Sequence, residues 1–274
     1  MKKISLYLVP TPIGNLSDMT IRAVEVLKSV DFIAAEDTRK SGILLKHFEI
    51  KKPMISYHEH NKSGRGDVII ERLNNGETCA LISDAGMPAI SDPGEMLVAQ
   101  CIKNNLNVSA LPGPCAAVTA LAMSGISTQR FCFEGFLSTA KNSRREHLSS
   151  LESEKRTIIF YEAPHKLKGT LNDLYSHFGS RRISLIREIS KIYEEVLLTT
   201  IPEAVEYYKD REVYGEFVLI IEGRAEDEKV EISEEKLKIV FNEYISQGMT
   251  KSVAAKTVAT RFDMSRREIY DKFK

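Results

Sequence analysis

The stretch Leu81–Gly94, LISDAGMPAISDPG, limits the possible folds more than any other part of the chain. Its apolar start, continuous with Ala80, is typical of a buried strand, and the Gly, Pro and Asp residues after it predict a loop. In open α/β sheets, ligands bind in the crevice outside the carboxyl ends of the strands. We therefore expect Asp84, two residues beyond the strand, to lie at a ligand-binding edge.

Two other predicted strands end in similar loops. Ile4–Val9 is followed by Pro10–Asn15, and Asn107–Leu111 is followed by Pro112-Gly113-Pro114 before a helical pattern begins at Ala116. Because parallel strands end at the same edge of a sheet, the three loops are expected to converge on one crevice.

The first half of the chain alternates strand and helix patterns. Ser17 or Asp18 is expected to cap a helix with apolar residues at Ile21, Val24 and Leu27. Gly64 and Gly66 are expected to break the chain before a helix over 68–73. Repeated strand–helix units predict an α/β lobe over 1–124, with a parallel sheet covered on both faces.

The second half predicts a different architecture. Ser124–Ser127 is the expected boundary, because the next strand, Phe131–Leu137, leads into a polar helix instead of another glycine loop. The strands Ile183–Arg187 and Val196–Thr200 are expected to be antiparallel neighbours, since their connection is short. These patterns predict a mixed-sheet α+β lobe over 125–224, followed by a charged linker over 225–232.

Residues 233–274 predict a small helical segment with three helices. Ser265 and Glu268 have the spacing of a capping box for the last helix, and the final two helices resemble a helix-turn-helix. Met249–Lys274 contains seven Lys and Arg residues but only three Asp and Glu residues. This local excess predicts nucleic-acid contact, to which Arg266 and Arg267 would contribute.

Composition restricts the possible partners and compartment. The 274 residues include 38 Lys and Arg and 38 Asp and Glu, so a nucleic acid would have to bind local basic patches. The four cysteines have no paired spacing, which favours a reducing cytosol and argues against a metal site. No apolar run approaches the roughly 20 residues of a membrane span. We expect a soluble, cytoplasmic protein with neither membrane nor metal partners.

The loop sequences also restrict the ligand. A dinucleotide site needs GxGxxG after the first strand, where this chain has Pro12-Ile13-Gly14, and the phosphate-binding pattern GxxxxGK[ST] is absent. A ligand held by backbone groups and one carboxylate, without a phosphate, fits better.

Seven motifs in order resemble one known family. They are VPTPIGNLSDMT (9–20), AEDTR (35–39), SDAGMPAISDPG (83–94), LPGP (111–114), FYEAPHK (160–166), REISK (187–191) and GEFVLIIEG (215–223). Together they are similar to the ribosomal RNA small subunit methyltransferase I group of the tetrapyrrole methylase superfamily. The resemblance implies a two-lobed fold, S-adenosylmethionine as cofactor, and 2'-O-methylation of a cytidine in the decoding region of 16S ribosomal RNA.

The resemblance also implies cofactor contacts and a homodimer. The positions that match cofactor-contacting positions of the superfamily are Ile13, Asp84, Ala85, Gly86, Met87, Cys115, Ala116, Glu162, Ala163 and Ile189. The chain departs from the tetrapyrrole-specific members, whose first loop is typically GxGPGD and whose second is GGDP or GDP. This departure argues against a porphyrin-like substrate.

The implied chemistry requires a base and cationic residues. A positioned base would take the proton of the ribose hydroxyl, and cations would neutralise the flanking phosphates. The candidate bases near strand ends are Glu36, Asp37, His58, His60 and Glu188. The candidate RNA contacts are Arg39, Lys141, Arg144, Arg145, Lys166, Arg187, Lys191, Arg266 and Arg267.

Two other functions remain open from the sequence. One is a small-molecule, tetrapyrrole-type methylase of the same fold, which would need an enclosed trough where an RNA enzyme needs a basic rim. The other is a nucleic-acid-binding regulator that uses the large domain as a ligand sensor and the C-terminal helices as its contact.

Overall fold

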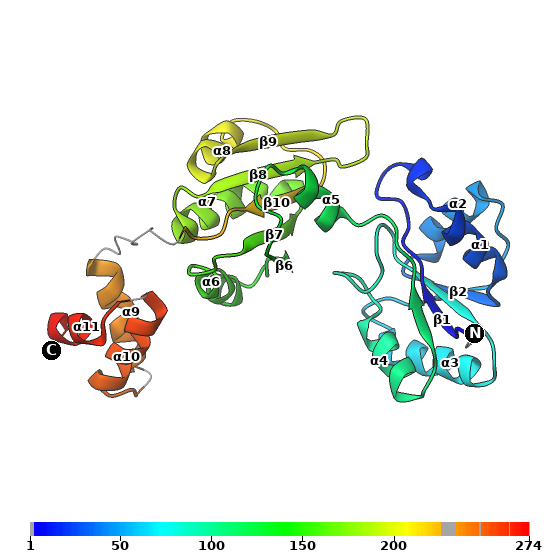
Figure 1. Cartoon of the computed structure of the whole chain (residues 1–274), viewed down its shortest axis with the longest axis horizontal. Coiled ribbons are helices and arrows are strands. Elements are labelled where there is room, and N and C mark those ends of the chain that lie inside the picture. Colours follow the sequence, from blue (N-terminus) through cyan, green and yellow to red (C-terminus); the bar gives the residue numbers. More distant parts are fainter. Residues whose placement is uncertain (1–2, 226–233, 247, 263, 274) are drawn as a thin grey trace.

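The computed structural model describes residues 3–225, 234–246, 248–262 and 264–273, except for the side chains at 235, 236, 266 and 268. Figure 1 shows two α/β lobes and a separate group of C-terminal helices. The predicted linker lies outside the described residues except for Ala225.

The first lobe is built on a parallel five-stranded sheet in the order β3-β2-β4-β1-β5. Its strands are β1 (Leu6–Leu8), β2 (Phe32–Ala35), β3 (Met54–Ser56), β4 (Cys79–Ile82) and β5 (Val108–Ala110). The helices are α1 (Ile21–Ser29), α2 (Thr38–His47), α3 (Lys62–Asn74) and α4 (Glu95–Lys103). Residues of α1 and α2 pack on one face and those of α3 and α4 on the other. The predicted parallel sheet with two covered faces is therefore confirmed.

Two local predictions in this lobe are wrong. Thr20 caps α1, because its side-chain oxygen accepts a hydrogen bond from the Ala23 amide at 3.1 Å, while Ser17 and Asp18 lie in the preceding 3₁₀ turn η1 (Leu16–Asp18). Gly64 and Gly66 do not break the chain, because both lie inside α3, which begins at Lys62. A Cβ at Gly66 would be 2.6 Å from Gln100 Oε1, so Gly66 faces the Gln100 side chain of α4.

The second lobe contains a mixed sheet in the order β6-β7-β10-β8-β9. Its strands are β6 (Phe131–Phe136), β7 (Thr157–Glu162), β8 (Arg182–Arg187), β9 (Glu195–Thr200) and β10 (Phe217–Ile221). β6 and β7 are parallel, and the remaining pairs are antiparallel, including the predicted β8–β9 pair. The mixed sheet predicted for this half is confirmed.

Helices cover both faces of the second sheet. α6 (Lys141–Ser150), α7 (Leu167–Phe178) and α8 (Ile201–Tyr208) contribute to the core on one face, with the short η2 (Pro164–Lys166) leading into α7. α5 (Ala116–Met123) covers the other face, where Ala120 and Leu121 pack with Ile159 and Ile220. The predicted boundary after residue 124 placed α5 in the first lobe. The buried face of α5 packs against the second sheet instead.

The C-terminal segment consists of α9 (Glu234–Ser246), α10 (Lys251–Phe262) and α11 (Arg266–Lys272). They share a small apolar core that includes Phe241, Val258 and Ile269. The predicted capping box at Ser265 lies partly outside the description, because the Glu268 side chain is not described. Within the described ranges, every helix is too short or too polar to cross a lipid bilayer.

Candidate functional site

The loops after β1 and β4 are joined by hydrogen bonds. The Thr11 amide donates to the Gly86 carbonyl at 2.9 Å, and the Gly86 amide donates to the Thr11 carbonyl at 2.9 Å. The buried Thr11 hydroxyl also donates to the Ser83 carbonyl at 3.2 Å. These bonds fix two of the three predicted loops beside each other.

The third loop packs against the first two. A Cβ at Gly113 would be 2.9 Å from Pro10 Cβ, so only glycine allows this approach. A Cβ at Gly86 would be 3.9 Å from the Pro114 carbonyl oxygen and 3.4 Å from Ile13 Cγ2. The structure therefore brings the three loops together at the carboxyl ends of β1, β4 and β5.

A cleft of about 560 Å³ is lined by these loops and by the second lobe. The ten residues that the resemblance associates with a cofactor all line it, namely Ile13, Asp84, Ala85, Gly86, Met87, Cys115, Ala116, Glu162, Ala163 and Ile189. Their contact with a cofactor stays a prediction. The volume lies within the ordinary range of small-molecule sites.

Tyr161 forms part of the second-lobe wall of the cleft. Its hydroxyl oxygen accepts a hydrogen bond from the Ala117 amide, at the first turn of α5, at 3.1 Å. Burial raises the pKa of Tyr161 to about 12, so the phenol keeps its proton at neutral pH. The contact ties β7 to α5 beside Cys115 and Ala116.

Lys191 lies between two carboxylates where the second lobe meets the first loop. Its Nζ is 2.8 Å from Glu188 and 2.9 Å from Glu216. Burial lowers the pKa of Lys191, but the hydrogen bonds to both carboxylates outweigh burial and raise it overall. A Cβ at Gly14 would be 2.4 Å from Lys191 Cγ, so this side chain lies directly on the first loop. Its charge is compensated within the protein, which leaves it less available to a phosphate.

Acidic side chains gather where β2 and β4 end. The Asp84 amide donates to Glu36 Oε2 at 3.3 Å, and Asp84 accepts from the Asp37 amide at 3.2 Å and from Lys40 Nζ at 2.6 Å. Glu36, Lys40 and Asp84 line the cleft. Asp37 caps α2 by accepting from the Arg39 amide at 2.9 Å, and hydrogen bonds from the Arg39 side chain and amide lower its pKa to about 2.

Asp92 is a site residue that the sequence analysis treated only as a loop residue. It lines the cleft and is half-buried, and burial raises its pKa to about 6, with further increases from the charges of Glu36 and Asp84. A hydrogen bond with Ser83 partly opposes this rise. Strongly shifted carboxyl groups in a cleft often have functional roles. The repeated Asp of SDAGMPAISDPG was the available sequence signal.

The cleft wall does not include the other candidate bases, Asp37, His58, His60 and Glu188. The His58 amide donates to Asn61 Oδ1 at 2.8 Å, and the rings of His58 and His60 are 6.0 Å apart. Glu188 accepts from Lys191 and from the Glu216 amide at 2.9 Å. Burial raises the pKa of Glu188, but these hydrogen bonds outweigh burial and lower it overall.

Most of the predicted RNA contacts are paired with carboxylates of the protein. The half-buried Arg144 and Arg187 lie 2.6 Å from Asp173 and 3.0 Å from Glu195. Arg39, Arg145 and Arg267 are exposed and lie 3.0 Å from Asp37, 3.9 Å from Glu243 and 3.7 Å from Asp271. Lys141 is exposed, whereas Lys166 is half-buried. The side chain of Arg266 lies outside the description.

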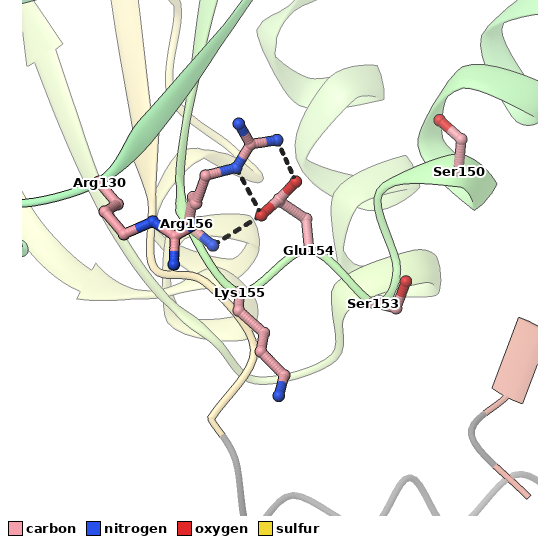
Figure 2. A pocket seen from close by; sticks show the side chains of 6 residues that line it. All are labelled: Arg130, Ser150, Ser153, Glu154, Lys155 and Arg156. Carbon is pink, nitrogen blue, oxygen red and sulfur yellow. Dashed lines mark hydrogen bonds and ion pairs between the residues drawn. The ribbon is translucent and has the colours of Figure 1, made fainter.

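A second hollow, of about 330 Å³, lies on the second lobe and shares no lining residue with the cleft (Figure 2). Its lining residues are Arg130, Ser150, Ser153, Glu154, Lys155 and Arg156. Glu154 accepts two hydrogen bonds from the Arg156 guanidinium, at 2.9 and 2.6 Å. The positive charge of Arg156 is therefore already neutralised within this hollow. The convergence of strand-end loops makes the larger cleft the candidate site.

The two lobes and the cleft between them correspond to a known methylase fold. The family model for tetrapyrrole (corrin/porphyrin) methylases matches residues 5–205, so the chain belongs to that family. Solved structures with this fold include a Thermus thermophilus uroporphyrin-III-C-methyltransferase, with a TM-score of 0.57, 16% identity and coverage of 80% of this chain and 94% of that one. A diphthine synthase matches with a TM-score of 0.62, 11% identity and coverage of 80% and 90%.

Sequence relatives define the group within the family. A protein named ribosomal RNA small subunit methyltransferase I from Synechocystis sp. is 47% identical, over 97% of this chain and 95% of its own length. Proteins with the same name from Halalkalibacterium halodurans and Bacillus subtilis are 48% and 46% identical, over 97% and 98% of this chain and 93% of their own lengths. The group indicated by the seven motifs is therefore confirmed.

The electrostatics of Asp92 lead to a stability prediction. Its pKa is about 6 in the folded protein and near 3.9 when unfolded, so ionisation opposes folding as the pH rises from about 4 to about 6. Asp92→Asn removes this ionisation. The free energy of unfolding of Asp92→Asn minus that of wild type should be larger at pH 7.5 than at pH 4.5, by roughly 1 to 2 kcal/mol. This value allows for solvent screening of the half-buried carboxylate.

Urea unfolding at the two pH values measures this difference. The matched control is Asp210→Asn, which neutralises an exposed carboxylate just beyond α8. If both variants show the same pH dependence as wild type, Asp92 has an ordinary pKa.

Proposed function

We propose that this chain is an S-adenosylmethionine-dependent methyltransferase that methylates the ribose 2'-hydroxyl of a cytidine in the decoding region of 16S ribosomal RNA. The observation that supports it most is the cleft in which three strand-end loops meet the second lobe. The names of the relatives support ribosomal RNA of the small subunit as the substrate. The expected cellular location is the cytoplasm.

The residues of the cleft fit this cofactor. Apolar side chains from both lobes, Ile13, Met87, Ile189 and Val218, offer surfaces to an adenosyl group, and Gly86 has no side chain to obstruct it. Asp84 and Asp92 provide negative charge for a cation. When bound, S-adenosylmethionine supplies a methyl group on a positively charged sulfur, which leaves as a neutral thioether once a hydroxyl oxygen has taken the methyl carbon.

The protein must then accept the hydroxyl proton, and Asp92 is suited to this role. A general base works best when its pKa is near the operating pH. Asp92 lines the cleft with a pKa raised to about 6, whereas hydrogen bonds lower the pKa of Asp37 and of Glu188. Glu36 also lines the cleft, but its Oε2 accepts from the Asp84 amide. We assign proton acceptance to the Asp92 carboxylate, with Glu36 and Asp84 maintaining its basicity.

Exposed cations would contact the RNA backbone. Arg39 lies in the first turn of α2 next to the acidic group, Lys141 and Arg145 lie on α6, and Arg267 lies on α11. Phosphate contacts of this kind provide affinity that is independent of sequence and sensitive to salt.

The chain is also proposed to form a homodimer through the exposed edge of the second sheet. On β9, Val196 and Leu198 are 42% and 45% exposed, and Val118 of α5 is 50% exposed. Ile192, in the β8–β9 connection, is 95% exposed. An open edge strand with apolar side chains is typical of a surface that a partner covers.

Two lysine substitutions test the dimer. Leu198→Lys places a charge on the proposed interface and should convert the dimer to monomer in light scattering after gel filtration. Ile239→Lys changes a residue of α9 that is 60% exposed, and it should leave the dimer intact. A wild-type protein that runs as a monomer at micromolar concentration contradicts the proposal.

The methyl transfer itself has a direct test. Incubation with methyl-labelled S-adenosylmethionine and small ribosomal subunits that lack the modification should place the label on a cytidine ribose. Gly86→Val should weaken cofactor binding at least tenfold in calorimetry, because the new side chain crowds Ile13. The control is Gly76→Val, which has a similar positive φ (90° against 78°) but open space around it, and it should bind like wild type. Label on a base, or no heat of cofactor binding, contradicts the proposal.

The assignment of Asp92 predicts a pH profile. Single-turnover methyl transfer by wild type should rise as Asp92 ionises near pH 6 and then level off. Asp92→Asn should lower the rate by about a hundredfold, within the range for lost general-base catalysis, and remove this rise. Both rates are measured at saturating S-adenosylmethionine, because the substitution also removes negative charge that favours the cationic cofactor. A variant that keeps the wild-type rate and profile excludes Asp92 as the acceptor.

A further inference from the structure

Three aromatic rings form a row that ends in the cleft. Phe133 contacts Tyr161 at a ring-centroid distance of 5.0 Å, and Phe136 contacts Tyr161 at 5.5 Å, both edge to face. Phe133 packs against the core under α5, whereas Phe136 is 56% exposed and lines the cleft with Tyr161. Tyr161 lies between the other two rings, and Phe136, at the exposed end, presents aromatic surface to a ligand that enters the cleft.

A β-bulge gives Phe136 this position. Residues three apart on a regular strand point to opposite faces, so Phe133 and Phe136 would not normally contact the same ring. The β6–β7 register shifts between Phe133 and Gly135, and Gly135 has a φ of +64°. Bulges redirect side chains and are frequent next to active sites. Here the extra residue turns Phe136 to the same side as Phe133.

The bulge also touches the first lobe. A Cβ at Gly135 would be 3.2 Å from Ser91 Oγ, so the strand end lies against the loop that carries Asp92. Ser91 itself has a φ of +61°. Gly135, next to Phe136, thus lies against the loop that carries the proposed proton acceptor, and Phe136 and Asp92 line the same cleft.

We propose that Phe136 and Tyr161 form a stacking subsite for the nucleobase of the RNA nucleotide that enters the cleft. This proposal rests on the proposed function and specifies how the same site holds its substrate. Bases of single-stranded RNA are commonly held by stacking on aromatic side chains. An exposed ring suits a base that arrives from solvent on a polynucleotide.

Charge near the strand ends favours an RNA base as the occupant. β6 and β7 are parallel neighbours, so Lys141 at the start of α6 and Lys166 at the end of η2 both follow the same edge. Cations at this edge would be near the phosphates of a nucleotide stacked on Phe136. The adenine of the cofactor is the other source of a stacking ring, and the test separates the two.

The chain contains no tryptophan, so Phe136→Trp introduces the only indole of the chain, which can be excited selectively over its tyrosines. Unmethylated small subunits should quench its emission, because a stacked base quenches an indole, while S-adenosylmethionine alone should change it little. A variant with the same probe at an exposed position of the same strand, Phe131→Trp, should respond to neither. Quenching by the cofactor alone assigns the ring to adenine and overturns the proposal.

Affinity gives a second readout. Phe136→Leu keeps the apolar character and removes the ring, and it should weaken binding to unmethylated small subunits about tenfold or more. Phe136→Tyr should restore binding, and calorimetry should give the same cofactor affinity for all three proteins. An unchanged subunit affinity in Phe136→Leu overturns the stacking subsite. Wild type that transfers no methyl to ribose overturns the proposed function instead, whatever the fluorescence shows.

Discussion

The pair of hydrogen bonds between Thr11 and Gly86 is the constraint on which the site depends. It joins the loops after β1 and β4, two central strands of the first sheet, and the buried Thr11 hydroxyl adds a third bond to Ser83. Backbone groups that leave a sheet must find new partners, and here they find them in each other. These bonds therefore extend the hydrogen bonding of the sheet into the loops that line the cleft.

Among the described residues, most charged side chains in the cleft are paired with an opposite charge, but Asp92 is not. Lys40 is paired with Asp84, and Lys191 is shared by Glu188 and Glu216. Asp92 has no cation among the groups that shift its pKa. A half-buried carboxylate without a cation becomes basic, and it would also attract a cationic ligand. In the proposed function, the same arrangement would attract the cofactor and accept the hydroxyl proton.

The glycine and proline pattern was sufficient for the sheet classes and the three converging loops, because these residues mark strand ends clearly. The ten cleft residues came from the resemblance to a known family and not from that pattern. The pattern was insufficient for Gly64 and Gly66, which lie inside α3 although glycine usually marks a break. Asp92 was overlooked because its burial arises from the fold around it, including the left-handed Ala89 and Ser91. The bulge that redirects Phe136 depends on register with β7, which no local pattern encodes. Features set by packing between distant segments were the ones missed.

The chain passes from the first sheet to the helix of the second at Pro112–Cys115, since α5 packs with the second sheet. Two of these four residues are prolines with fixed φ, and Gly113 lies directly against Pro10. These residues restrict the connection, and Gly135 lies close to Ser91 on the far side of the cleft. A pocket whose walls are already joined in this way would lose less binding energy to ordering them when a ligand enters.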